Sequence, residues 1–204
     1  MNARLPLAAF LFALSLRAAP AQESAPLEEA RKIVLRLESA LGKISDAPLA
    51  IDADTEKPNL LKAGEGTGLM IVPDRKLSAA SFTGAAGEVA PLGQLWIRTV
   101  LLAAEGRPVA AEKRRIVAVD DHGKTADVQL YLLGIGQAGG SPELVVYGKD
   151  KQPLLRVPLV ELDGATQDLP VELSGRKSGE DTGVLTMKIL GRYRAELTVM
   201  KGGQ

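Results

Sequence analysis

The chain has 204 residues, in which 25 lysines and arginines balance 25 aspartates and glutamates, with one histidine, no cysteine and 3% aromatic residues. A zinc site built from cysteine and histidine needs four such ligands, and a facial iron site needs two histidines, so both are excluded. The lack of cysteine excludes disulfides, and the zero net charge argues against a nucleic-acid binder, which normally carries a basic excess.

The first 21 residues have the pattern of a cleaved secretory signal peptide. Met1–Arg4 carries one positive charge, the apolar run Leu5–Leu16 follows, and the Ala-Pro-Ala sequence at 19–21 predicts cleavage before Gln22. The run of 12 apolar residues is too short for a membrane anchor, which needs about 20. Export without cysteine favours a bacterial envelope. We therefore expect a periplasmic or extracellular protein with no integral membrane segment after signal cleavage.

The segment after the signal predicts one amphipathic helix, Ala25–Leu41. Apolar residues recur at spacings of three and four and form one stripe, made of Leu27, Ala30, Val34, Leu37 and Leu41. Ser24 is positioned to cap the helix and Gly42 to end it, while Glu28 and Lys32 form a supporting pair. We expect the helix to pack on its own domain, and a partner-binding helix is the alternative.

The rest of the chain predicts a β domain. We divide it into an N-terminal helix with an irregular lead-in, residues 22–62, and a β domain, residues 63–204. Pattern is weak from Lys43 to Leu92, where we expect short strands or a helix, for example near Ser78–Phe82. Nine strands separated by turn residues are predicted: Gly68–Val72, Leu95–Leu102, Arg115–Val119, Asp127–Leu133, Glu143–Tyr147, Leu154–Val160, Leu169–Leu173, Val184–Leu190 and Tyr193–Met200.

Short strands without intervening helices predict an antiparallel β-sandwich or open barrel of about 8–9 strands with one N-terminal helix. In the last hairpin, Leu185, Met187 and Ile189 alternate with polar residues, and Gly191-Arg192 suits a two-residue turn. The run LVVYGKDKQPLLRVPLVEL, residues 144–162, resembles a stretch of C2 domains. The likeness covers 19 residues, has only Asp150 where those domains have paired calcium aspartates, and implies a sandwich without implying a function.

Two glycine-rich motifs have the spacing of phosphate-binding loops. Gly134-x-Gly136-x-x-Gly139 satisfies the dinucleotide-binding pattern, but a strand follows it where the chemistry requires a helix N-terminus. We therefore interpret these glycines as a flexible hairpin loop. The sequence Gly64-x-Gly66-x-Gly68 also leads into a strand and lacks the phosphate-loop lysine.

Acidic loops offer the other candidate chemistry. Asp52-x-Asp54-x-Glu56 has alternating oxygen donors, but the glycine and the bidentate glutamate of a helix–loop–helix calcium site are replaced by Lys57 and Ala63. A looser calcium site from these acids, or from the Asp120-Asp121 pair, stays open. His122 lies beside that pair, and we expect an exposed turn histidine.

No sequence motif nominates a catalytic residue. The chain has no Gly-x-Ser-x-Gly motif, and the single tryptophan, Trp96, is expected to be a core residue of a sheet. We therefore predict no catalytic residue, no cofactor and no metal ligand. We interpret the protein as a non-enzymatic interaction or structural module that binds another envelope protein through an edge strand or the N-terminal helix. The alternative is a small exported hydrolase that uses carboxylates, with calcium.

Overall fold

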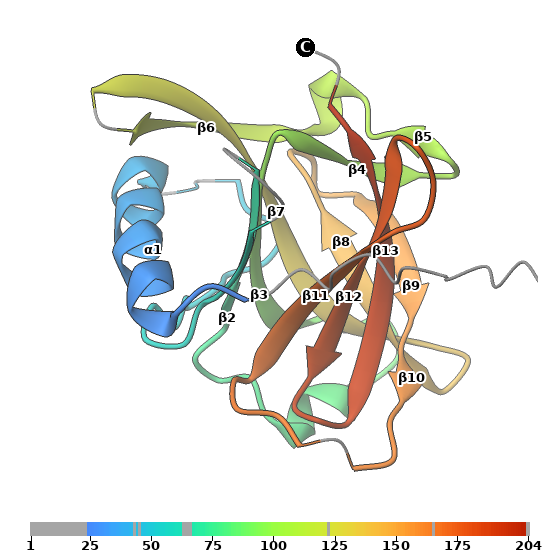
Figure 1. Cartoon of the computed structure of the whole chain (residues 1–204). Helices are drawn as coiled ribbons and strands as arrows, with labels where there is room; N and C mark the ends of the chain where they lie inside the picture. Colours follow the sequence, from blue (N-terminus) through green and yellow to red (C-terminus); the bar gives the residue numbers. More distant parts are fainter. Residues whose placement is uncertain are drawn as a thin grey trace, which may run out of the picture.

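The computed structural model describes residues 24–42, 44, 46–62, 67–121, 123–164 and 166–202. Within these ranges the chain is mainly β, with one α-helix, two short 3-10 helices and thirteen strands arranged in two antiparallel sheets (Figure 1). The predicted signal peptide lies outside the described residues. No helix in the described part of the chain is long and apolar enough to cross a membrane.

The larger sheet has the order β1-β2-β3-β7-β8-β9, and β6 pairs with the first half of β7. Its strands are β1 (Asn59–Lys62), β2 (Gly68–Pro73), β3 (Ala90–Arg98), β6 (Arg115–Asp121), β7 (Lys124–Ala138), β8 (Ser141–Tyr147) and β9 (Pro153–Pro158). Strands β6 and β8 pair with successive halves of β7, so the β6–β7 hairpin extends beyond the rest of the sheet.

The smaller sheet has the order β11-β12-β13-β4-β5, and β10 pairs with β13. Its strands are β4 (Val100–Ala104), β5 (Arg107–Pro108), β10 (Val160–Glu161), β11 (Val171–Lys177), β12 (Thr182–Ile189) and β13 (Tyr193–Lys201). The 3-10 helices are η1 (Ala79–Phe82) and η2 (Ala111–Lys113), and η1 lies where short strands or a helix were expected, near Ser78–Phe82.

The inner core lies between the two sheets. Alternate residues of strands in both sheets point into it, among them Ile71, Leu95, Leu133, Val146, Leu185, Met187 and Leu197. Phe82 of η1 stacks on Tyr193 of β13 with ring centroids 4.4 Å apart, which closes one end of this core. The predicted alternation of the last hairpin is confirmed, because Leu185, Met187 and Ile189 are buried in it.

One polar network is buried where the chain crosses from one sheet to the other. The Tyr131 hydroxyl donates to Gln129 Oε1 at 2.9 Å, and Gln129 Nε2 donates to the Val100 carbonyl at 2.7 Å. Burial raises the pKa of Tyr131 to about 12. The network therefore fixes β7 of the larger sheet to the start of β4 in the smaller one, with each partner hydrogen-bonded.

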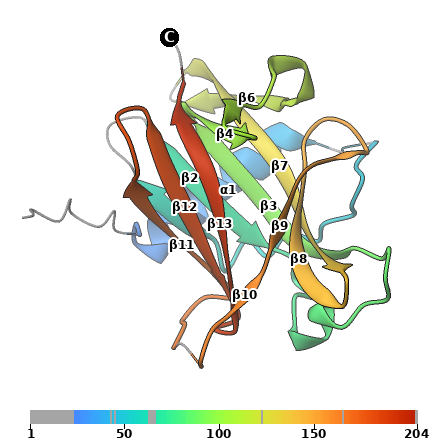
Figure 2. The same cartoon turned by 90° about the vertical axis from the view of Figure 1, so that its right-hand side faces the viewer.

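A second core lies on the opposite face of the larger sheet, under α1 (Leu27–Leu41). The predicted helical stripe faces the sheet, with Ala30, Val34 and Leu37 buried. Figures 1 and 2 show the resulting layers: the helix, the larger sheet with the β6–β7 hairpin extending past the helix, and then the smaller sheet. Gly42, with φ +60°, ends the helix as expected.

The start of the helix differs from the sequence prediction. The helix begins at Leu27 rather than Ala25, and Pro26 is its N-cap residue without a side-chain cap. The Ser24 hydroxyl instead accepts a hydrogen bond from Asn59 Nδ2, because this segment adds a bridge to β1 before the helix starts. Glu28 pairs with Arg31 at 2.7 Å rather than with Lys32.

The prediction of eight or nine strands was wrong, since the described chain has thirteen. Strand β1 and the first residues of β3 lie in the segment where the pattern was weak. The expected run Leu95–Leu102 is divided at Thr99, whose φ of +69° redirects the chain from β3 into β4 of the other sheet. The expected run Leu154–Val160 is likewise divided into β9 and β10.

The turn of the last hairpin is one residue longer than predicted. It contains Leu190, Gly191 and Arg192, because Ile189 pairs directly with Tyr193. Leu190 and Gly191 both have positive φ, +51° and +64°, and the Arg192 amide donates to the Ile189 carbonyl at 3.0 Å. In the four-residue turn Ile189–Arg192, Leu190 and Gly191 are the two central residues. Positive φ at both gives the turn a twist that matches the two antiparallel strands.

Candidate functional site

The dinucleotide-like glycine motif is part of a buried strand. Gly134 and Gly136 lie within β7, where the prediction of a flexible loop was wrong, and only Gly139 lies in the turn after it. A Cβ on Gly134 would come within 2.3 Å of Val89 Cγ1 and 2.9 Å of Leu49 Cδ1. Gly134 is therefore needed so that the chain segments before β1 and β3 can pack on this face of the sheet.

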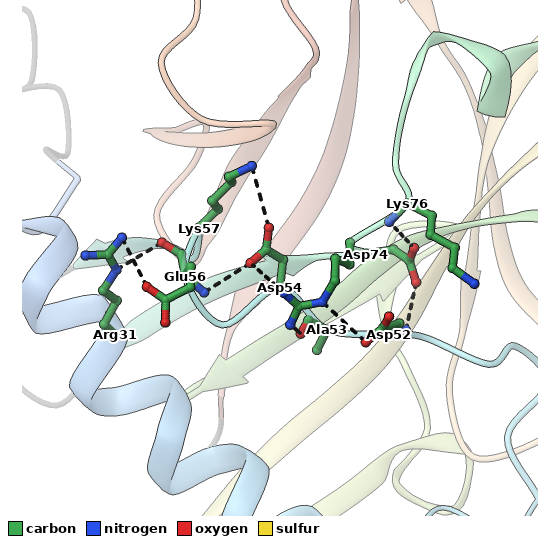
Figure 3. Close-up of polar contacts among 9 residues, drawn as sticks. Arg31, Asp52, Ala53, Asp54, Glu56, Lys57, Asp74 and Lys76 are labelled. Carbon is green, nitrogen blue, oxygen red and sulfur yellow. Dashed lines mark hydrogen bonds and ion pairs between the residues drawn. The ribbon is translucent and has the colours of Figure 1, made fainter.

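The acidic residues of the candidate calcium loop are engaged in ion pairs and turns (Figure 3). Asp54 is buried, accepts a hydrogen bond from the Glu56 amide at 3.2 Å, and lies 3.7 Å from Lys57 Nζ. Glu56 pairs with Arg31 of the helix at 3.4 Å. These contacts fasten the lead-in segment to α1.

A second set of contacts joins the same segment to the end of β2. Asp74 is buried, and its two carboxylate oxygens accept the amides of Asp52 and Lys76, each at 2.8 Å (Figure 3). Arg75 lies 3.6 Å from Asp52 and 3.8 Å from Asp54. Among the described residues no group of three or more acidic or histidine side chains is placed to hold a metal ion.

The Asp120-Asp121 pair also divides between separate partners. Asp120 accepts the Gly123 amide at 2.8 Å and so stabilises the β6–β7 turn, while Asp121 pairs with Arg98 of β3 at 2.8 Å. His122 lies outside the described residues.

The prediction of Trp96 as a core residue of a sheet is confirmed, because it is 1% exposed in β3. Its indole N–H donates to Gln94 Oε1 at 2.9 Å. Glu38 of α1 also hydrogen-bonds to the side chain of Gln94. Burial raises the pKa of Glu38, and this hydrogen bond partly opposes the rise. The Glu38 Oε1 atom is buried without a hydrogen-bond partner among the described residues.

Most sheet edges are protected against pairing with another chain. The free side of β1 is covered by the segment before the helix, since the Ala25 amide donates to the Leu60 carbonyl at 2.7 Å. In β11 the Leu173 amide donates to the Asn59 side chain at 2.8 Å. Strand β9 begins and ends in proline, and β5 and β10 have two residues each. Short strands and edge prolines are common protections of this kind.

Strand β6 has none of these protections. It has seven residues without proline, and its pairing with β7 has no bulge. Among the described residues, the backbone from Ile116 to Asp120 makes no hydrogen bond except those to β7. Ile116 is 46% exposed, one of three large apolar side chains exposed in the described part of the chain.

A groove of about 390 Å³ runs beside the first half of β6. Apolar residues from the end of α1 and the segment after it line one side, and strand residues line the other: Ala40, Leu41, Ile44, Asp46, Arg115, Ile116, Val117 and Ala118. Arg114 and Arg115 precede the apolar centre of the strand and Asp120 and Asp121 end it. We name this surface, β6 with its adjoining groove, the β6 edge.

Sequence reasoning anticipated that an edge strand would be available but did not identify which one. The composition of Arg115–Asp121, apolar in the middle and charged at both ends, was the available signal. Comparison of the chain with protein-family models, with curated proteins and with solved structures gives no match.

Proposed function

We propose that the chain is an exported, non-enzymatic β-sandwich module of the bacterial cell envelope that binds an extended segment of another envelope protein along the β6 edge. The observation that carries the proposal is that, among the described residues, the backbone of Ile116–Asp120 has no hydrogen-bond partner on the side away from β7. Added strands gain affinity from main-chain hydrogen bonds and specificity from pockets for alternate side chains. The sandwich assignment is supported by the single inner core that the two sheets share.

The charges of β6 favour a particular kind of partner. The strand begins with Arg115, which follows Arg114, and ends with two aspartates, and its centre, Ile116–Val119, is apolar. Complementary charge fixes the register of a bound segment more than it adds to affinity. We therefore expect a segment with an apolar centre, an acidic residue at the Arg115 end and a basic residue at the Asp121 end.

The test is capture of a partner by the immobilised mature chain from envelope extracts, comparing Ile116→Lys with Val160→Lys. Ile116 and Val160 are similarly exposed, 46% and 50%, but Val160 lies in β10, away from the β6 edge. A lysine on an exposed edge opposes strand addition. We expect wild type and Val160→Lys to capture the same protein and Ile116→Lys to lose it. Equal capture by both variants contradicts the proposal.

No observation on the described residues favours the carboxylate-dependent hydrolase. Asp52, Asp54, Asp74 and Asp121 are each engaged with an arginine or a backbone amide. Burial raises the pKa of the Glu38 carboxyl group, and its hydrogen-bond partner is a glutamine rather than a second acid. General acid–base catalysis by two carboxyl groups needs a second carboxylate on the other side of the bond that is cleaved.

A further inference from the structure

A pocket of about 510 Å³ lies between α1 and the outer face of the larger sheet, and it shares no lining residue with the groove of the β6 edge. Pockets that hold small molecules have volumes of about 300–1,000 Å³. Helix residues form one wall, the hairpin forms another, and β1, β2 and β3 form the floor.

The floor and walls of the pocket are apolar. They are made of Ala126 and of side chains of the second core under α1: Ile33, Leu37, Leu60, Met70, Trp96, Val119 and Val128. The indole N–H of Trp96 is already bonded to Gln94, so it offers no donor to a ligand. Inside the pocket, therefore, the described residues favour a hydrocarbon body.

The rim carries charge, and most of it is neutralised in pairs. Lys62 lies 2.5 Å from Glu29, and Arg98 lies 2.8 Å from Asp121. Asp120 accepts a backbone hydrogen bond in the hairpin turn.

Arg36 is the exception on the rim. It lies on the exposed side of α1, lines the pocket, and has no hydrogen-bond or ion-pair partner among the described residues. An unpaired guanidinium beside an apolar cavity is suited to a carboxylate, which it can bind with two parallel hydrogen bonds.

We propose that this pocket binds a fatty-acid-like amphiphile, with its hydrocarbon chain against Met70, Trp96 and Val128 and its carboxylate at Arg36. The proposal does not rest on strand binding at the β6 edge, although the last residues of β6, Val119, Asp120 and Asp121, also line this pocket. The carboxylate stays in water at the rim while the chain is buried, so only one charge needs a partner.

Trp96 reports binding directly because it is the single tryptophan of the chain and lines the pocket. The probes are octanoate, decanoate and dodecanoate at neutral pH, each kept below its micelle concentration, with dodecanol as the uncharged counterpart. We expect a saturable change in tryptophan emission, and an affinity that rises up to about fourfold for each added methylene while the chain still fits.

Two variants separate the head-group contact from the apolar contact. Arg36→Gln should weaken dodecanoate by about fivefold, as for an exposed ion pair, and leave dodecanol unchanged. The matched control is Lys32→Gln, since Lys32 is an exposed cation of the same helix that does not line the pocket. Ala126→Leu and Ala126→Phe fill the pocket and should weaken both ligands, with melting curves confirming that each variant is folded.

Three results overturn the proposal: no saturable change with any of the acids, equal weakening of dodecanoate by Arg36→Gln and Lys32→Gln, or unchanged binding in both folded Ala126 variants. Weaker dodecanoate binding by Arg36→Gln than by Lys32→Gln, together with unchanged dodecanol binding, supports it.

Discussion

Replacing Glu38 by glutamine should stabilise the protein at neutral pH. In the native structure Glu38 Oε1 is buried without a hydrogen-bond partner among the described residues, and burial is the main cause that raises the pKa of this carboxyl group. Glutamine has the same shape and removes the charge, while its amide can keep a hydrogen bond with Gln94.

The sign of the pH dependence follows from that pKa. The folded state holds the proton of Glu38 above the ordinary pKa of 4.5, so the folded state binds more protons than the unfolded state in the pH range just above that value. Stability therefore falls as pH rises through this range. The advantage of Glu38→Gln should be complete above it and absent below about pH 4, where both states of the wild type are protonated.

An unsatisfied buried polar group destabilises by about 1–3 kcal/mol, and the lower end applies because Glu38 is only half-buried. About 1 kcal/mol corresponds to a rise in Tm of about 2–4 °C for a domain of this size. The assay is thermal melting followed by circular dichroism at about pH 7 and about pH 3.5. The control is Glu112→Gln, an exposed position in η2. A Glu38→Gln variant that melts at or below wild type at pH 7, or keeps its advantage at low pH, refutes the reasoning.

Two further predictions concern the candidate ligand motifs. Gly134→Ala should lower the free energy of unfolding by about 1–3 kcal/mol through overpacking against Val89 and Leu49, whereas Gly84→Ala, which meets no atom within 4 Å, should have little effect. Equal denaturant midpoints for the two variants would show that Gly134 is not in a packed strand. Millimolar calcium should leave Tm within about a degree of its value in chelator, because no group of acids among the described residues is placed to hold a metal ion. A ligand raises Tm when it binds the folded state and not the unfolded state. A reproducible rise of several degrees would indicate a metal site among the acidic loops.

Most of the fold that could be predicted came from apolar residues that recur every second residue in strands and every third or fourth residue in the helix. The stripe of α1 and the alternation of β12 and β13 depend only on which side of a local element is buried, so the sequence shows them directly. The two sheets could not be told apart in this way. Thr99 lies inside the run Leu95–Leu102, whose composition is typical of one continuous strand, and its left-handed conformation results from the crossing between sheets rather than from its own preference.

The candidate sites depend on tertiary neighbours and were less predictable. Gly134 and Gly136 have the spacing of a nucleotide motif, and only the packing of Leu49 and Val89 explains the glycine at position 134. The sequence predicted an available edge strand but did not show which one. β6 could be selected only once the structure placed Pro153 and Pro158 in the edge strand β9 and the segment at Ala25 over β1. The pocket at Arg36 forms between α1, the β6–β7 hairpin and strands β1, β2 and β3, which are distant in sequence, and no local pattern marks it.

Binding of a partner along β6 can be tested by hydrogen exchange of the backbone amides in Arg115–Asp121. The measurement compares the free mature chain with its complex with the captured envelope partner. We predict slower exchange in β6 on binding, with exchange in the proline-bounded edge strand β9, Pro153–Pro158, unchanged. Unchanged exchange in β6 together with protection of β9 or of α1 would contradict the claim.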